Sequence, residues 1–139
     1  MQLLKIVLSP ILFPISLLYS FVVFIRNRLY DYKILKSNQF DIPIISVGNI
    51  TVGGTGKTPH IEYLIKLLNT DFKVATLSRG YKRRTDGFVL STSESTDQEI
   101  GDEPCQIKQK FPETVVAVDA IRTNGINQLL TLKPELEAI

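Results

Sequence analysis

The sequence has little of what disulfide-rich and zinc-binding proteins depend on. It contains one cysteine, one histidine and no tryptophan. The single cysteine, Cys105, excludes an internal disulfide and fits a reducing compartment. The same scarcity excludes a Cys/His cluster for zinc. A net charge of only +2 gives no reason to expect nucleic acid as an electrostatic partner.

The average composition hides two different parts of the chain. A length of 139 residues is enough for one modest domain, and 44% hydrophobic with 22% charged residues is typical of globular proteins. Residues 6–25, however, contain no charged side chain at all. We therefore expect an apolar segment followed by a domain of ordinary composition.

The apolar segment predicts a membrane-associated helix. Its apolar residues surround the whole helical projection, and about 20 residues would just cross a bilayer. Pro10 and Pro14 complicate a crossing, because each removes a helix hydrogen bond outside a first turn. A helix starting at Pro14 leaves residues 15–25 unbroken, which is roughly 16 Å and too short to span. This favours a helix lodged in the membrane surface over a full crossing or a buried core helix.

Basic residues follow the apolar segment directly. They would meet anionic lipid head groups, and they would place the downstream chain in the cytoplasm if the segment spans. No small-x-small cleavage site follows, which argues against a secretory signal. We assign residues 1–36 to the membrane-associated segment with its basic flank, and residues 37–139 to the domain. The flank consists of Arg26, Arg28, Lys33 and Lys36.

The centre of the chain predicts a phosphate-binding loop. A short apolar run over residues 44–47 is followed by a glycine-rich turn and then by a helix starting near Lys57. Lys57 would bind the β- and γ-phosphates of a nucleotide, and the Thr58 hydroxyl would ligate Mg²⁺. One departure is Thr51, which stands where the usual pattern has glycine. The predicted nucleotide-binding residues are Thr51, Val52, Gly53, Gly54, Thr55, Gly56, Lys57 and Thr58.

The rest of the domain predicts an α/β fold, a parallel sheet flanked by helices as in P-loop NTPases. Strands are expected over residues 44–47, 72–77, 87–91 and 114–118. Helices are expected after Thr58, from Asp102 and over residues 120–132. In the first of these, apolar residues at helical spacing would pack on the sheet, namely Ile61, Leu64, Ile65 and Leu68.

Several polar residues stand where such strands or helices meet a ligand. Arg79 follows a strand, so it would contact substrate or phosphate, although a salt-bridged structural arginine explains it equally well. Asp102 and Glu103 would serve Mg²⁺ or a proton transfer, although spacing alone favours a helix cap with a first-turn acid. His60 stands at a helix start, where a surface role is favoured over catalysis.

Four motifs in this order resemble the tetraacyldisaccharide 4′-kinase family of lipid A biosynthesis. They are Val47-Gly48-Asn49, the loop from Thr51 to Pro59, Leu77-Ser78-Arg79-Gly80-Tyr81 and Gly101-Asp102-Glu103-Pro104. The resemblance implies transfer of the γ-phosphate of ATP, with Mg²⁺, to the 4′-hydroxyl of the tetraacylated glucosamine disaccharide that precedes lipid A. It also implies a place among membrane lipids, at the cytoplasmic face of the inner membrane of a Gram-negative bacterium.

The resemblance assigns roles to individual residues. It implies that Asp102 acts in catalysis with a downstream histidine, which His60 does not match, and that Glu103 binds Mg²⁺ or positions groups. Lys57 is implied on the phosphates, and Arg122 on substrate or phosphate. The resemblance also implies a longer protein, with paired aspartates for Mg²⁺ and a second lobe. We therefore expect this chain to be an amino-terminal portion that does not complete phosphoryl transfer alone.

Other readings remain open from the sequence. A deviant-loop ATPase of the partitioning type would need a lysine where Val52 stands, which argues against it. A non-catalytic membrane-docking module that binds nucleotide, or nothing, is an alternative of a different class, which equal nucleotide binding by Lys57→Ala and the parent chain would favour. A chain that exists only as a gene fragment is a further alternative.

Overall fold

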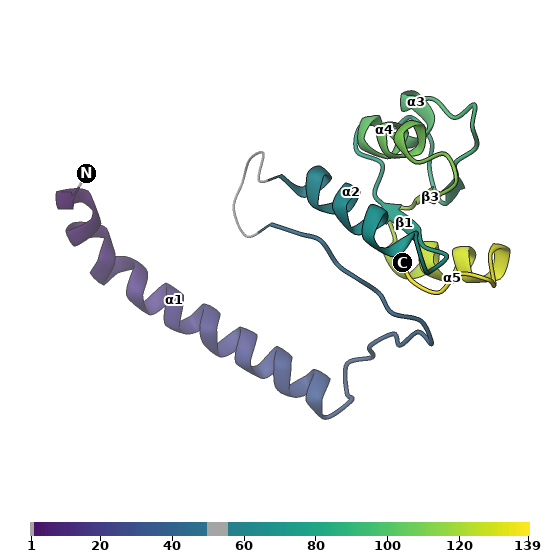
Figure 1. Ribbon diagram of the computed structural model, residues 1–139. Coiled ribbons are helices and arrows are strands. Elements are labelled where there is room, and N and C mark those ends of the chain that lie inside the picture. Colours follow the sequence, from purple (N-terminus) through teal and green to yellow (C-terminus); the bar gives the residue numbers. More distant parts are fainter. Residues whose placement is uncertain (1, 50–55) are drawn as a thin grey trace. The chain divides into compact units, whose positions relative to one another are not determined.

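A computed structural model describes residues 2–49 and 56–139. Contacts divide the chain into two compact units, residues 1–39 and residues 40–139. The first unit contains one long helix and the turn that follows it. The second contains the sheet and the remaining helices (Figure 1).

The amino-terminal helix α1 (Gln2–Asp31) continues without interruption past Pro10 and Pro14. The expectation of a short helix beginning at Pro14 is therefore wrong. The two prolines lie one helical turn apart, so the hydrogen bonds they remove fall on one side and the other sides continue. A 30-residue helix is about 45 Å long. By length and composition, Leu12–Asp31 could cross a bilayer. The prediction that the helix lies in the membrane surface because it is too short to span therefore loses its basis.

Apolar side chains of α1 are open to solvent within its unit. Phe13 is 66% exposed and Leu17 is 62% exposed. Such a continuous apolar surface is unfavourable in water and marks an interaction site. Association with membrane lipids stays our prediction for this helix.

Deleting residues 1–31 is expected to release the chain from lipid. Pelleting with liposomes should fall at least about tenfold, because the deletion removes the apolar surface that the helix would bury in the bilayer. Replacing Arg26 and Arg28 by glutamine is the control, since it should weaken only the salt-sensitive part of the binding. Unchanged pelleting of the deleted chain would place the lipid-binding surface elsewhere.

The sheet of the second unit has the strand order β1-β3-β2. Strand β1 (Ala75–Ser78) pairs in parallel with β3 (Val115–Val118), with Ala75 opposite Val115. Strand β2 (Val89–Leu90) pairs with β3 in the antiparallel direction. The predicted α/β class is confirmed, but the described sheet is mixed rather than parallel. A loop without a crossover helix connects β1 to β2, whereas a parallel pair needs a longer crossover.

Residues 44–47 do not form the strand expected there. The Ile45 N–H donates to the Ile139 carbonyl at 2.8 Å, and the Ile139 N–H donates to the Pro43 carbonyl at 3.1 Å. This pattern is a parallel pairing of Ile44 with Ile139. On its other side the same terminal segment pairs in parallel with β1, through Val74 and Ala138. Among the described contacts, the segment over residues 44–47 is paired at this one point only.

Helices cover both faces of this sheet. Successive β3 residues point to opposite faces, so Ala117 packs with Leu129 of α5, whereas Val116 packs with Ile65 of α2 and Ile107 of α4. Figure 1 shows α5 on the side of the sheet away from α2 and α4. A short helix, α3, was not predicted from the sequence; a capping box formed by Thr96 and Glu99 starts it. The helices are α2 (Lys57–Leu68), α3 (Asp97–Ile100), α4 (Asp102–Lys110) and α5 (Arg122–Leu132).

Candidate phosphate-binding site

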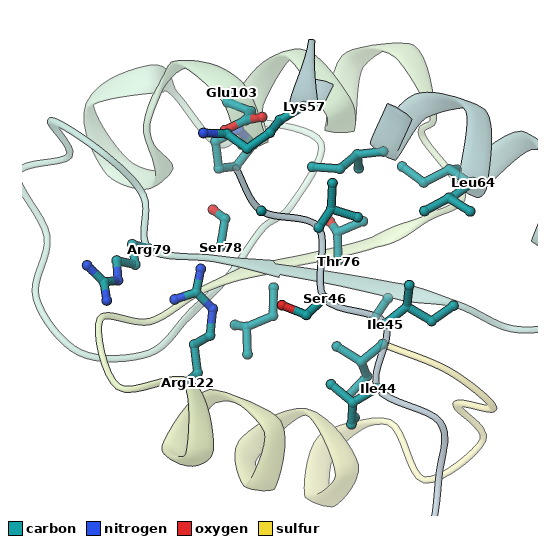
Figure 2. A pocket seen from close by; sticks show the side chains of 18 of the residues that line it. Ile44, Ile45, Ser46, Lys57, Leu64, Thr76, Ser78, Arg79, Glu103 and Arg122 are labelled. Carbon is teal, nitrogen blue, oxygen red and sulfur yellow. The ribbon is translucent and has the colours of Figure 1, made fainter. Parts of the chain in front are cut away.

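A cavity of about 650 Å³ lies in the second unit, along the length of β1 and beyond its carboxyl end. Its walls come from residues 44–49, one side of α2 along its whole length, β1 with the loop after it, the starts of α4 and α5, and residues 138–139. Polar side chains gather at one end (Figure 2). They belong to Lys57, Ser78, Arg79, Asp102, Glu103 and Arg122.

The start of α2 meets the requirements of an anion site. The first helix hydrogen bond runs from the His60 N–H to the Gly56 carbonyl at 3.2 Å, so the N–H groups of Lys57 and Thr58 precede it. Gly56 has a φ of 77°, a left-handed conformation that glycine adopts readily. The Lys57 side chain is exposed and lines the cavity. The predicted contacts Thr51, Val52, Gly53, Gly54 and Thr55 lie outside the described residues.

The two predicted metal ligands contact each other. Thr58 Oγ1 donates a hydrogen bond to Glu103 Oε1 at 2.8 Å, although the residues are far apart in sequence. A hydroxyl and a carboxylate are the hard oxygen ligands that Mg²⁺ prefers. The described residues contain no group of three metal-binding His, Cys, Asp or Glu side chains. This pair therefore suits a Mg²⁺ that keeps waters and phosphate oxygens as its other ligands.

Asp102 stands beside this pair as the first residue of α4. The N-cap of that helix is Gly101, so the expectation that Asp102 caps the helix is wrong. Asp102 and Glu103 are instead both acids of the first turn of α4. Asp102 is exposed and lines the cavity. Its carboxylate is thus open to a ligand rather than used inside the helix.

Two glycines bring the motifs after β1 and before α4 into backbone contact. Gly80 has a φ of 67° and Gly101 a φ of 92°. A Cβ on Gly101 would lie 2.8 Å from the Tyr81 carbonyl oxygen, and a Cβ on Gly80 would lie 2.8 Å from the Ile100 carbonyl oxygen. Only glycine permits this approach at either position. The contact fixes the acids of α4 relative to Arg79.

Arg79 and Arg122 reach the cavity from neighbouring strand ends. Arg79 follows β1, and Arg122 begins α5 shortly after β3. Both side chains are exposed and both line the cavity, with Ser78 at the same end (Figure 2). Two guanidinium groups at one end of a cavity suit a phosphate or carboxylate oxyanion.

Sequence reasoning missed Asp119, which directly follows β3. Its side chain is 2% exposed, and its N–H donates to the Ser78 carbonyl at 2.9 Å. A lone acid at the end of an otherwise apolar strand was the available signal. Such a residue must find donors once it is buried.

His60 takes no part in the cavity. Its Nδ1 donates to the Gly56 carbonyl at 2.7 Å and its side chain is exposed. This contact lies within the first turn of α2, which supports the surface role favoured from sequence.

The other end of the cavity is apolar and lies in a gap between β1 and residues 44–47. The Ala75 N–H donates to the Ala138 carbonyl at 3.0 Å, whereas the Ser78 carbonyl faces β3. Leu77 alternates with Ser78, so its backbone groups face the gap between β1 and residues 44–47. Only the polar end of the cavity is therefore shaped for phosphate. The apolar lining is Ile44, Ile45, Leu64, Leu68, Val74, Ala138 and Ile139.

A helix start with free N–H groups and a hydroxyl–carboxylate pair beside it, near the carboxyl end of a strand in an α/β sheet, are typical of the P-loop NTPase class. Comparison with known proteins gives the family. A model of the tetraacyldisaccharide-1-P 4′-kinase family, LpxK, matches residues 8–139, and the chain belongs to that family.

Curated relatives carry the same description. The chain is 58% identical over 131 residues to tetraacyldisaccharide 4′-kinase of Flavobacterium johnsoniae, covering 93% of this chain and 38% of the relative. It is 61% identical over 118 residues to the protein of that name from Phocaeicola vulgatus, covering 85% of this chain and 32% of the relative. The chain thus spans about a third of the length of these curated relatives.

A solved structure shares the fold. LpxK from Aquifex aeolicus, crystallised in complex with ATP, superimposes with a TM-score of 0.72 at 37% identity. The match covers 94% of this chain and 42% of that one. It confirms the P-loop kinase fold expected from the sequence.

Proposed function

We propose that this chain provides the ATP- and Mg²⁺-binding part of a tetraacyldisaccharide 4′-kinase. The reaction transfers the γ-phosphate of ATP to the 4′-hydroxyl of the tetraacylated disaccharide precursor of lipid A. The observation that carries the proposal is the Thr58–Glu103 hydrogen bond beside Lys57 at the start of α2. Family membership and the ATP complex of the Aquifex aeolicus protein support it.

Phosphoryl transfer depends mainly on positioning and on neutralising charge. Lys57 would bind the β- and γ-phosphates together with the free N–H groups that begin α2. Thr58 and Glu103 would hold Mg²⁺, which when bound neutralises charge on the phosphates. Arg79 and Arg122 would bind phosphate oxygens at the same end of the cavity.

Asp102 would accept the proton of the attacking sugar hydroxyl. Its carboxylate is exposed to the cavity at the start of α4, next to Glu103. A histidine partner, if one acts, would come from outside this chain, because the sole histidine is His60 and its Nδ1 is bonded to Gly56. The acyl chains of the substrate would stay in the membrane, with α1 keeping the domain at the cytoplasmic face of the inner membrane.

The direct test is a phosphate-transfer assay with radioactive ATP and the lipid disaccharide. We expect the 139-residue chain to bind ATP but to transfer no phosphate, since it spans about a third of its relatives. The complete Flavobacterium johnsoniae kinase is the positive control. Transfer by the 139-residue chain at the rate of that control would contradict the expected inactivity.

Thr58→Val is expected to remove the metal-dependent part of ATP binding. The substitution keeps the shape of the side chain but deletes the hydroxyl that contacts Glu103. Calorimetric titration with ATP should show roughly tenfold weaker binding in Mg²⁺ and no change in EDTA. Thr58→Ser is the matched control and should bind like the parent chain. Equal losses with and without Mg²⁺ would assign the hydroxyl to phosphate rather than to metal.

A further inference from the structure

Asp119 is the most deeply buried carboxylate among the described residues, and the mechanism above does not use it. Its Oδ1 accepts the Ile121 N–H at 2.8 Å, and its Oδ2 accepts Asn124 Nδ2 at 2.6 Å. No cation pairs with it among residues 2–49 and 56–139. These N–H donors therefore offset the cost of burying its charge.

The contacts of Asp119 fix how α5 begins. Ile121 is the N-cap of α5 and has no side chain able to cap the helix. The carboxylate replaces that cap by holding the N-cap N–H with one oxygen and the first turn, through Asn124, with the other. Arg122 lies between these two anchored residues. One carboxylate thus contacts the backbone on one side of Arg122 and a side chain of the first turn on the other.

The same residue ties α5 to the end of β1. The Asp119 N–H donates to the Ser78 carbonyl, and Arg79 follows directly. Gly125 makes room for the arrangement, because a Cβ there would lie 3.0 Å from Asp119 Cβ and 2.8 Å from the Leu77 methyl carbons. The backbone positions of Arg79 and Arg122 are therefore connected through one residue, Asp119.

We propose that Asp119 is a positioning residue for Arg122, aiming its guanidinium group at a phosphate oxyanion in the cavity. The inference rests on the proposed function, since that function supplies the phosphate. The oxyanion is either a phosphate of the nucleotide or the phosphate of a phosphorylated disaccharide acceptor. In both cases the carboxylate acts through Arg122 and does not touch the ligand.

A double-mutant cycle tests the inference. Asn124→Ala removes one donor to Asp119 from an exposed position, and thermal unfolding of each variant checks that it is folded. Asp119→Asn is the second variant, and Asn127→Ala, exposed on the same helix, is the matched control. Each is made alone and with Arg122→Ala. Affinities are measured for ATP with Mg²⁺ and, separately, for detergent-dispersed tetraacyldisaccharide 1-phosphate.

Arg122→Ala should weaken binding of one of the two probes roughly tenfold. Asn124→Ala and Asp119→Asn should each weaken binding of the same probe about threefold, but only when Arg122 is present. The probe that responds identifies the source of the phosphate. Asn127→Ala should change neither affinity.

Two results would overturn the inference. The first is that Asn124→Ala and Asp119→Asn still weaken binding when Arg122 is replaced by alanine, because a general structural role would persist without the arginine. The other is no effect of Arg122→Ala on either probe. Failure of the proposed function looks different, because the parent chain would then bind no ATP, and the cycle would be decided on the disaccharide phosphate alone.

Discussion

Lys57→Ala is expected to lower the affinity for ATP about 100-fold. The lysine is an exposed cation at the start of α2 and lines the polar end of the cavity. No ion pair holds it among the residues that the structure describes. Its charge is therefore available to a polyphosphate, and losing it should leave the helix and the core unchanged.

The measurement is calorimetric titration with ATP and Mg²⁺, with thermal unfolding recorded for each variant. Lys66→Ala is the matched control, since Lys66 lies in the last turn of the same helix and does not line the cavity. That variant should bind ATP like the parent chain. Equal affinity of Lys57→Ala and the parent would instead favour the membrane-docking module that the sequence left open.

The elements that could be predicted from the sequence are those with a local signal. The start of α2 at Lys57 follows from a glycine-rich turn before a helical apolar pattern. The apolar runs that became β1 and β3 are buried between two helical layers, where continuous apolar sequence is expected. The start of α4 at Asp102 follows from acidic residues in a first turn.

Two elements differ from the prediction, one because of pairing with a distant segment and one because of the spacing of two prolines. Residues 44–47 pair with a segment far along the chain, at Ile139, and their own apolar pattern does not encode that partner. Helix α1 continues through Pro10 and Pro14 although each removes a hydrogen bond, because both losses fall on one side. Local proline rules do not include that geometry.

The sequence predicted which residues form the candidate site, but it did not predict the contacts between them. The sequence suggested Thr58 and Glu103 as separate oxygen ligands, and only the fold brings them within hydrogen-bond distance. Asp119 was missed because its role depends on donors from α5 and an acceptor on β1. Hydrophobic periodicity in the sequence does not identify such a residue.

The contact between Gly80 and Gly101 was missed for a related reason. Each glycine is recognisable in the sequence, but their shared requirement for close backbone approach appears only when β1 and α4 are in place. This contact leads to the expectation of the largest loss of stability.

Gly101→Ala is expected to destabilise the domain by about 3 kcal/mol or more. A φ of 92° costs any residue that carries a Cβ, and that Cβ would lie 2.8 Å from the Tyr81 carbonyl oxygen and 3.1 Å from the Gly80 carbonyl carbon. Both atoms belong to the backbone, so no side chain can rotate away. The segments must separate, and Asp102 and Glu103 would move with α4.

Gly87→Ala is the matched control, because Gly87 also has a positive φ, 68°, but nothing lies within 4 Å of a Cβ there. It should cost only about 1 kcal/mol, the conformational part of the penalty. Urea unfolding of both variants separates the two contributions. Equal losses would mean that the backbone approach of Gly80 and Gly101 contributes nothing to stability. A larger loss for Gly101→Ala, together with weaker ATP binding in Mg²⁺, would show that the same contact holds Glu103 against Thr58.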